Sequence, residues 1–99
     1  MDNKQKCMNL LGLAQRSGNL ISGEALVLNA IRSREAKIVI LASDASDNTT
    51  KQFLNKSDHY RVPVLKELTR GELSAAIGRA RTVAAVTDGG FAQSLQKLQ

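Results

Sequence analysis

Several residue types are scarce in this chain of 99 residues, and each scarcity removes a class of function. Cys7 is the sole cysteine, which excludes an internal disulfide and a cluster of thiolate metal ligands. His59 is the sole histidine, and no nucleophile–base set can be assembled around it, so we expect a protein that is not an enzyme. Tryptophan is absent, and the only aromatic residues are Phe53, Tyr60 and Phe91, which argues against a single-strand binder built on stacking aromatic side chains.

Long apolar runs are also missing. No segment approaches the roughly 20 apolar residues that a membrane helix needs, and residues 1–6 are polar, unlike a signal peptide. We therefore expect no membrane partner and a cytoplasmic location. Asp44 and Asp47 lack a third ligand for a metal ion, and Gly89-Gly90 lacks the spacing of a phosphate-binding loop, so we expect no cofactor.

Positive charge, in contrast, is plentiful. Fourteen Lys and Arg residues against nine Asp and Glu residues give a formal net charge of +5. For a chain this small, that balance favours a polyanionic partner, and nucleic acid is the commonest one. The length, together with a hydrophobic content of 42%, predicts a single folded domain over residues 1–99.

The hydrophobic spacing predicts helices that alternate with short strands. Helices are expected over residues 4–16 and 23–33, after Ser46 or Asp47, between Thr69 and Gly78, and after Asp88. Strands are expected over residues 20–21, 36–42, 62–65 and 82–87. This alternation predicts an α/β fold with helices on both faces of a mostly parallel sheet.

Residues 16–24 predict a tight turn, a short strand and the start of a helix. Gly18 is expected to adopt the left-handed conformation that ends a helix, and Ser22 is expected to be the N-cap of the next one. Glu24 suits the positive end of that helix, and Gly23 lets another backbone approach closely. Free N–H groups beside Arg16 make this start a candidate phosphate site. The alternative is a capped helix and nothing more.

Basic residues flank many of the predicted element ends. If these ends converge, the cations form a positive rim around the start of the helix at Gly23. Arg79 and Arg81 follow a helix C-terminus, where they can satisfy free carbonyl groups. The rim residues are Arg16, Arg32, Arg34, Lys37, Lys66 and Arg70.

Five stretches occur in a familiar order and spacing, namely residues 11–23, 30–33, 36–45, 62–64 and 72–78. Over about residues 6–95, the chain resembles the L7Ae/L30e superfamily of ribosomal proteins, in particular its bacterial YlxQ-type branch of RNA-binding proteins. The resemblance implies a single-domain, three-layer α/β/α sandwich around a four-stranded mixed sheet. It also implies non-enzymatic binding of structured RNA, of ribosomal origin or with a kink-turn.

The same resemblance assigns roles to particular residues. Gly23 matches an entrance glycine at the second helix, Lys37 matches a basic position that faces the RNA backbone, and residues 68–70 match a loop that covers an extruded base. The complete set of candidate RNA-binding residues is Arg16, Ser22, Gly23, Glu24, Ala25, Asn29, Arg32, Lys37, Lys66, Leu68, Thr69 and Arg70.

The chain departs from the kink-turn binders at the start of the second helix. Their pattern there is Gly-x-Asn-Glu-x-x-Lys, whereas this chain has Ala25, Leu26 and Asn29 in the Asn, Glu and Lys positions. A bidentate base contact provides roughly 1–3 kcal/mol of discrimination, so losing two would remove most of the preference for a kink-turn. The alternative function is a protein-interaction module, with Leu26 exposed at the former RNA site.

Overall fold

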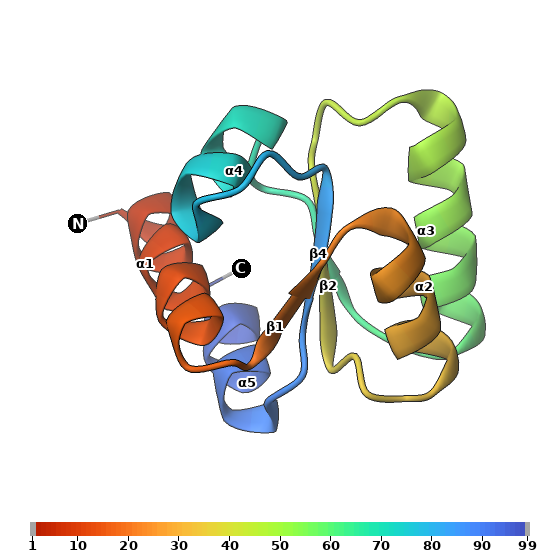
Figure 1. The fold of residues 1–99 in the computed structure, drawn as a ribbon, viewed down its shortest axis with the longest axis horizontal. Helices are drawn as coiled ribbons and strands as arrows, with labels where there is room; N and C mark the ends of the chain where they lie inside the picture. The colour runs from red at the N-terminus through yellow and green to blue at the C-terminus, as the bar shows by residue number, and fades with distance from the viewer. Residues whose placement is uncertain (1, 99) are drawn as a thin grey trace.

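The computed structural model describes residues 2–98, which form a four-stranded sheet covered by helices on both faces (Figure 1). The helices are α1 (Asn3–Arg16), α2 (Glu24–Arg32), α3 (Asp47–His59), α4 (Arg70–Ile77) and α5 (Gly89–Lys97). The strands are β1 (Leu20–Ser22), β2 (Ile38–Leu41), β3 (Val64–Leu65) and β4 (Val83–Val86). Every predicted helix and strand is therefore present, and β2, β3 and β4 are shorter than expected.

The sheet has the strand order β1-β4-β2-β3, and it is mixed. Strand β4 runs antiparallel to both β1 and β2, whereas β2 and β3 are parallel. The prediction of a mostly parallel sheet is therefore wrong, and the four-stranded mixed sheet implied by the family resemblance is confirmed. The two edge strands are short, with three residues in β1 and two in β3, which follows Pro63.

The short helix α4 explains why β4 runs antiparallel to β2. It has eight residues, so it is only about 12 Å long. The backbone N–H of Arg70 at its start donates to Asp44, which follows β2, and Ser74 in its middle accepts from the backbone N–H of Arg81, just before β4. The segments before and after α4 therefore both lie near the end of the sheet where β2 finishes. Strand β4 must start at that end, so it runs in the direction opposite to β2.

Two hydrophobic layers hold the helices on the sheet. Ile38, Ile40, Ala84 and Val86 pack toward α1, α4 and α5. Their neighbours in β2 and β4 point to the opposite face, because successive strand residues alternate, and pack toward α2 and α3. The result is the predicted three-layer α/β/α sandwich, in which Cys7 is a buried core residue.

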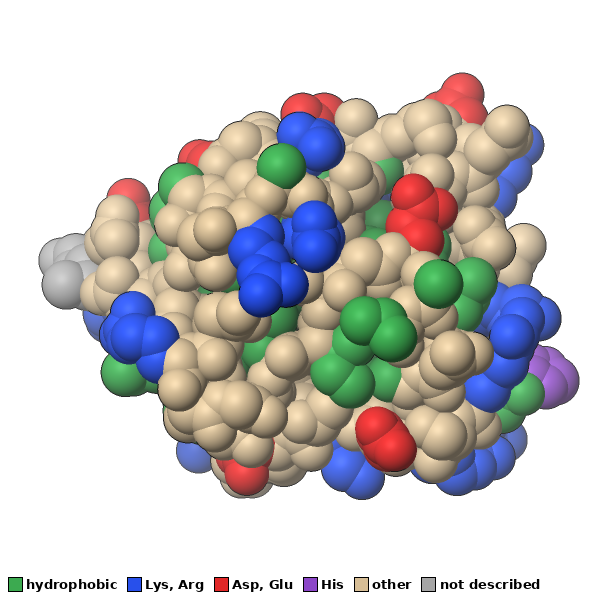
Figure 2. Space-filling view, viewed as in Figure 1, with side chains coloured by type: hydrophobic (Ala, Val, Ile, Leu, Met, Phe, Trp, Pro, Cys, Tyr) green, Lys and Arg blue, Asp and Glu red, His purple; other side chains and the backbone are tan. Residues whose placement is uncertain are grey.

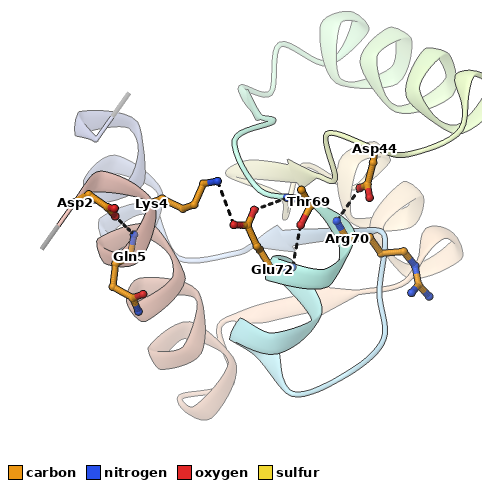
Figure 3. Close-up of polar contacts among 7 residues, drawn as sticks. All are labelled: Asp2, Lys4, Gln5, Asp44, Thr69, Arg70 and Glu72. Carbon is orange, nitrogen blue, oxygen red and sulfur yellow. Dashed lines mark hydrogen bonds and ion pairs between the residues drawn. The ribbon is translucent and has the colours of Figure 1, made fainter.

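Local signals at the ends of α1, α3, α4 and α5 are confirmed. Thr69 and Glu72 form a reciprocal capping box at the start of α4, as Figure 3 shows, and Gly78 ends that helix in the left-handed conformation with φ 75°. Gly18 follows α1 with φ 78°. The side chains of Ser46 and Asp88 cap α3 and α5.

Candidate nucleic-acid interface

Helix α2 begins without a side-chain cap. Gly23 is its N-cap residue, with φ 99° and ψ 147°, and no side chain accepts a hydrogen bond from the first turn. The other helices, α1, α3, α4 and α5, each have a side chain that accepts from a first-turn N–H, namely Asp2, Ser46, Thr69 and Asp88. The positive end of α2 is therefore open to an outside acceptor.

The prediction that Ser22 caps α2 is wrong, because Ser22 is the last residue of β1. It pairs with Ala84 in the sheet, and the next residue, Gly23, donates its N–H to the carbonyl of Val83 at 3.1 Å. The Ser22 hydroxyl instead accepts a hydrogen bond of 3.1 Å from Nε of Arg81. The side chain that was expected to accept from a first-turn N–H of α2 therefore positions Arg81 beside the start of that helix.

Arg81 is the site residue that sequence reasoning missed. Its Nε lies 3.7 Å from the point that a Cβ on Gly23 would occupy, so its guanidinium group borders the start of α2. The Ser74 hydroxyl accepts from the backbone N–H of Arg81 at 3.0 Å and donates to the backbone carbonyl of Arg81 at 3.2 Å. Nη1 of Arg81 also donates to the carbonyl of Ala80, which lies after the end of α4, so this bond is not the predicted one to a free carbonyl group of the helix C-terminus.

The loop before α4 reaches the same end of the sheet. The carbonyl of Leu68 accepts from the backbone N–H of Ser43 at 2.8 Å, and the backbone N–H of Arg70 donates to Asp44 at 2.7 Å (Figure 3). Nε of Arg70 donates to the Thr82 hydroxyl at 3.1 Å, directly after Arg81 in the chain. Figure 2 shows Lys and Arg side chains gathered near the middle of one face of the molecule.

We call this surface the β4-entry surface, and it comprises Ser22, Gly23, Arg70, Arg81 and Thr82. Other residues of the predicted site lie on the elements that carry this surface. Glu24, Ala25 and Asn29 are exposed on α2, and Lys66 is exposed on the loop before α4. Leu26, at 60% exposure, is a large apolar side chain left uncovered on α2.

Two predicted residues of the loop before α4 have structural roles. Leu68 is fully buried in the core beneath α4, so its side chain cannot contact RNA, and this part of the prediction is corrected. The Thr69 hydroxyl is engaged in capping α4, where it accepts from the backbone N–H of Glu72 at 3.1 Å.

The predicted positive rim around Gly23 does not form as a whole. The backbone N–H of Lys37 donates to the carbonyl of Val86, so Lys37 lies where β4 ends rather than where it begins. Arg34 and Lys37 line a separate open hollow of about 520 Å³ at that end. Arg32 closes the last turn of α2, at the far end from Gly23. These cations are separated because β2 starts opposite the end of β4.

Arg16 is also away from the β4-entry surface. Its Nη1 lies 3.4 Å from the point that a Cβ on Gly12 would occupy, and it lines a hollow between α1 and α4. Of the predicted rim, Arg70 belongs to the β4-entry surface, where it donates to Thr82 next to Arg81, and Arg81 is the cation that borders the start of α2.

Among the described residues, no carboxylate forms an ion pair with the cations of the β4-entry surface. Within residues 2–98, the ion pair present joins Lys4 to Glu72 at 3.1 Å, and it lies between α1 and α4. Neither Arg70 nor Arg81 takes part in it. Nε of each arginine donates to a neutral hydroxyl group, that of Thr82 for Arg70 and that of Ser22 for Arg81. Their positive charge is therefore available to an anionic ligand, although two exposed carboxylates lie nearby. These are Glu24 on the first turn of α2 and Asp44, which accepts from the backbone N–H of Arg70.

Metal and membrane features are not found in the described chain. Over residues 2–98, no three histidine, cysteine or acidic side chains are grouped so that they could hold a metal ion. None of the helices in this range has the length and apolar character needed to cross a bilayer.

Comparison with known proteins gives consistent relatives. The family model of the Ribosomal protein L7Ae/L30e/S12e/Gadd45 family matches residues 5–96. The chain is 46% identical to the RNA-binding protein YlxQ of Enterococcus faecium, over 97% of this chain and 93% of that protein. It is 49% identical to the RNA-binding protein YlxQ of Bacillus subtilis (strain 168), over 90% of each chain.

A solved structure supports the same assignment. A protein of unknown function from Bacillus halodurans C superposes with a TM-score of 0.90 at 40% identity, covering 94% of this chain and 95% of that one. The family match spans nearly the whole sequence, and the sandwich described above agrees with that relative throughout. The chain therefore belongs to the Ribosomal protein L7Ae/L30e/S12e/Gadd45 family.

Proposed function

We propose that this protein binds structured RNA through the β4-entry surface. The observation that carries the proposal is the uncapped start of α2 at Gly23, which is bordered by the guanidinium group of Arg81. The guanidinium group of Arg70 is held on Thr82, the residue after Arg81, and neither arginine is in an ion pair within residues 2–98. The relatives named RNA-binding protein YlxQ support the choice of RNA over other polyanions. The net charge of +5 acts in the same direction.

Two kinds of group would contact phosphate. The first-turn N–H groups of α2 supply fixed donors and the positive end of the helix dipole. Arg81 supplies a charged donor whose position is fixed by Ser22 and Ser74, so little conformational freedom is lost when RNA binds. Gly23, which lacks a side chain, leaves the RNA backbone room to approach the helix start.

Base recognition at this surface is expected to be weak. Ala25 and Leu26 are exposed where the kink-turn pattern has Asn and Glu, and neither side chain can hydrogen-bond to a base edge. The exposed Leu26 can instead cover a ribose or a base face. We therefore propose that binding depends on backbone shape and phosphate contacts, with residues 66–70 as a second contact beside the helix.

The proposal has three finer parts. The RNA is ribosomal, the protein acts in the cytoplasm, and its role is binding rather than catalysis. The family description, which begins with ribosomal proteins, supports the first and third parts.

The test is a fluorescence titration of the protein against a kink-turn RNA and a straight duplex of equal length, at two salt concentrations. We expect both affinities to fall steeply with salt, because phosphate contacts release counterions. We also expect the preference for the kink-turn to be small. No retention of either RNA at low salt would contradict RNA binding, and strong kink-turn preference would contradict only the weak base recognition.

A second candidate function is a protein-interaction module centred on Leu26, whose 60% exposure favours an apolar partner. Leu26→Glu separates the two functions. If the variant loses a protein complex and keeps RNA affinity, the partner surface lies at Leu26; if it loses RNA affinity, Leu26 belongs to the RNA site.

A further inference from the structure

A second surface lies between α1 and α5, on the side of α1 that faces away from α4 (Figure 1). An open groove of about 440 Å³ runs between these helices. Leu10, Leu13 and Leu98 form its apolar part, and Lys6 and Lys97 stand at its borders. The proposed RNA site uses none of these residues.

Leu13 is the most exposed of the three leucines in this groove. Its exposure is 48%, although its helix faces the core with Leu11 and Ala14. Leu13 also lines the hollow of about 370 Å³ on the other side of α1, toward α4. Because Leu13 lies between two hollows, a partner can pack against this apolar side chain from both sides.

The lysines that line the groove favour a negatively charged ligand. Lys6 and Lys97 line it, no carboxylate does, and neither lysine is in an ion pair within residues 2–98. A second copy of this chain would bring like charges together across the groove, which disfavours self-association. No aromatic side chain lines the groove, so it has no platform on which an RNA base could stack.

We propose that this groove docks an acidic, amphipathic helix of a protein partner. Lys6 and Leu13 are seven residues apart on α1, about 10 Å along the helix axis, and Leu10 lies between them. Helix-in-groove recognition uses apolar anchors at i, i+3 or i+4, and i+7, with polar groups beside them. The matching segment has about three helical turns, leucine-like anchors, and carboxylates that reach the bordering cations.

The proposal does not depend on RNA binding. Helix α1 packs between α4 and α5, as Figure 1 shows, and the groove lies on its α5 side. The β4-entry surface lies beyond α4, at the start of β4 and α2. Because the surfaces share no residue, both ligands can be bound at once, and failure of one proposal leaves the other standing.

The experiment uses two fluorescent synthetic peptides of equal length with the same leucine positions, one with Glu and one with Lys at the polar positions. We expect saturable binding of the Glu peptide and at least tenfold weaker binding of the Lys peptide. The double variant Lys6→Glu with Lys97→Glu should reverse that preference. Leu13→Asp should abolish binding, whereas Leu26→Asp, the matched change at the other exposed leucine, should leave it unchanged.

Three results would overturn the proposal. The first is a dissociation constant weaker than roughly 1 mM for both peptides. The second is equal loss of binding in Leu13→Asp and Leu26→Asp. The third is a dimer in sedimentation that Leu13→Asp dissolves, which would make the occupant a second copy. Circular dichroism of each variant checks its fold, and saturating duplex RNA should leave the affinity for the Glu peptide unchanged.

Discussion

Gly23 carries a backbone conformation that other residues rarely adopt, with φ 99° and ψ 147°. The Gly23→Ala variant should therefore lower the free energy of unfolding by about 1–3 kcal/mol. Its Cβ would meet Nε of Arg81 at 3.7 Å, an ordinary contact, so the loss would come from the backbone and not from a clash. Urea denaturation measures it.

Gly89→Ala is the matched control for Gly23→Ala. Gly89 is the first residue of α5, and a Cβ there would meet no atom within 4 Å. Alanine at this position should leave stability unchanged or raise it by up to about 1 kcal/mol. Equal losses in both variants would show that the conformation of Gly23 is not strained.

Arg81 should contribute one phosphate contact to RNA binding. Arg81→Ala should weaken affinity for duplex RNA by about tenfold and reduce the slope of log affinity against log salt by about 1. Lys51→Ala, a change at an exposed cation on α3, should alter neither quantity. A variant with lower affinity and an unchanged salt slope would mean that Arg81 positions the surface through Ser22 and Ser74 rather than touching phosphate.

At the scale of elements, the start of α4 places Arg70, and the charge of Glu72 helps to hold it. The backbone N–H of Thr69, and then Lys4, lower the pKa of Glu72 from its ordinary value of 4.5. A carboxyl whose pKa is lower in the folded state stabilises the fold above its unfolded pKa and loses that contribution as pH falls.

The Glu72→Gln variant tests this contribution. The free energy of unfolding of the wild type should fall as pH drops below about 4.5, and the variant should show a shallower fall in the same range. Glu35→Gln, at an exposed carboxylate on the turn after α2, is the comparison and should retain the wild-type pH dependence. Chemical denaturation at a series of pH values from neutral downward supplies the data.

Local chemistry explains why the helix ends could be predicted from the sequence. Thr69 and Glu72 are three residues apart, and Gly78 needs only its own φ, so short stretches of sequence contain all of the information. Ser22 failed as a cap for the opposite reason. Its hydroxyl is engaged by Arg81, which is 59 residues away in the chain, and no local pattern reports such a contact.

At the scale of the whole molecule, the layers could be predicted but the strand directions could not. Apolar runs such as residues 38–41 indicate that a strand is buried on both faces. They contain no information about the direction of the neighbouring strand. The position of β4 depends on a short α4 whose ends are tied to Asp44 and Arg81. The same arrangement separates Lys37 from Gly23, so the site could be predicted only in part.

The net charge should make salt act in opposite directions on stability and on binding. The formal net charge is +5, and one ion pair, Lys4 with Glu72, is present within residues 2–98. Added salt screens repulsion among unpaired cations, so the melting temperature should stay level or rise, while RNA affinity falls. Thermal melts and RNA titrations over one salt series check this; a melting temperature that fell with salt would reveal attractive charge contacts that the structure lacks.

The short sheet edges affect how the protein behaves at high concentration. Strand β1 has three residues and β3 has two, so a foreign strand could form only a few backbone hydrogen bonds at either edge. Long, flat edges are the usual templates for aggregation through strand addition, and very short edges resist it. The longer, fully apolar strands β2 and β4 occupy the interior of the sheet. The segments most prone to amyloid pairing are thus protected for as long as the fold holds.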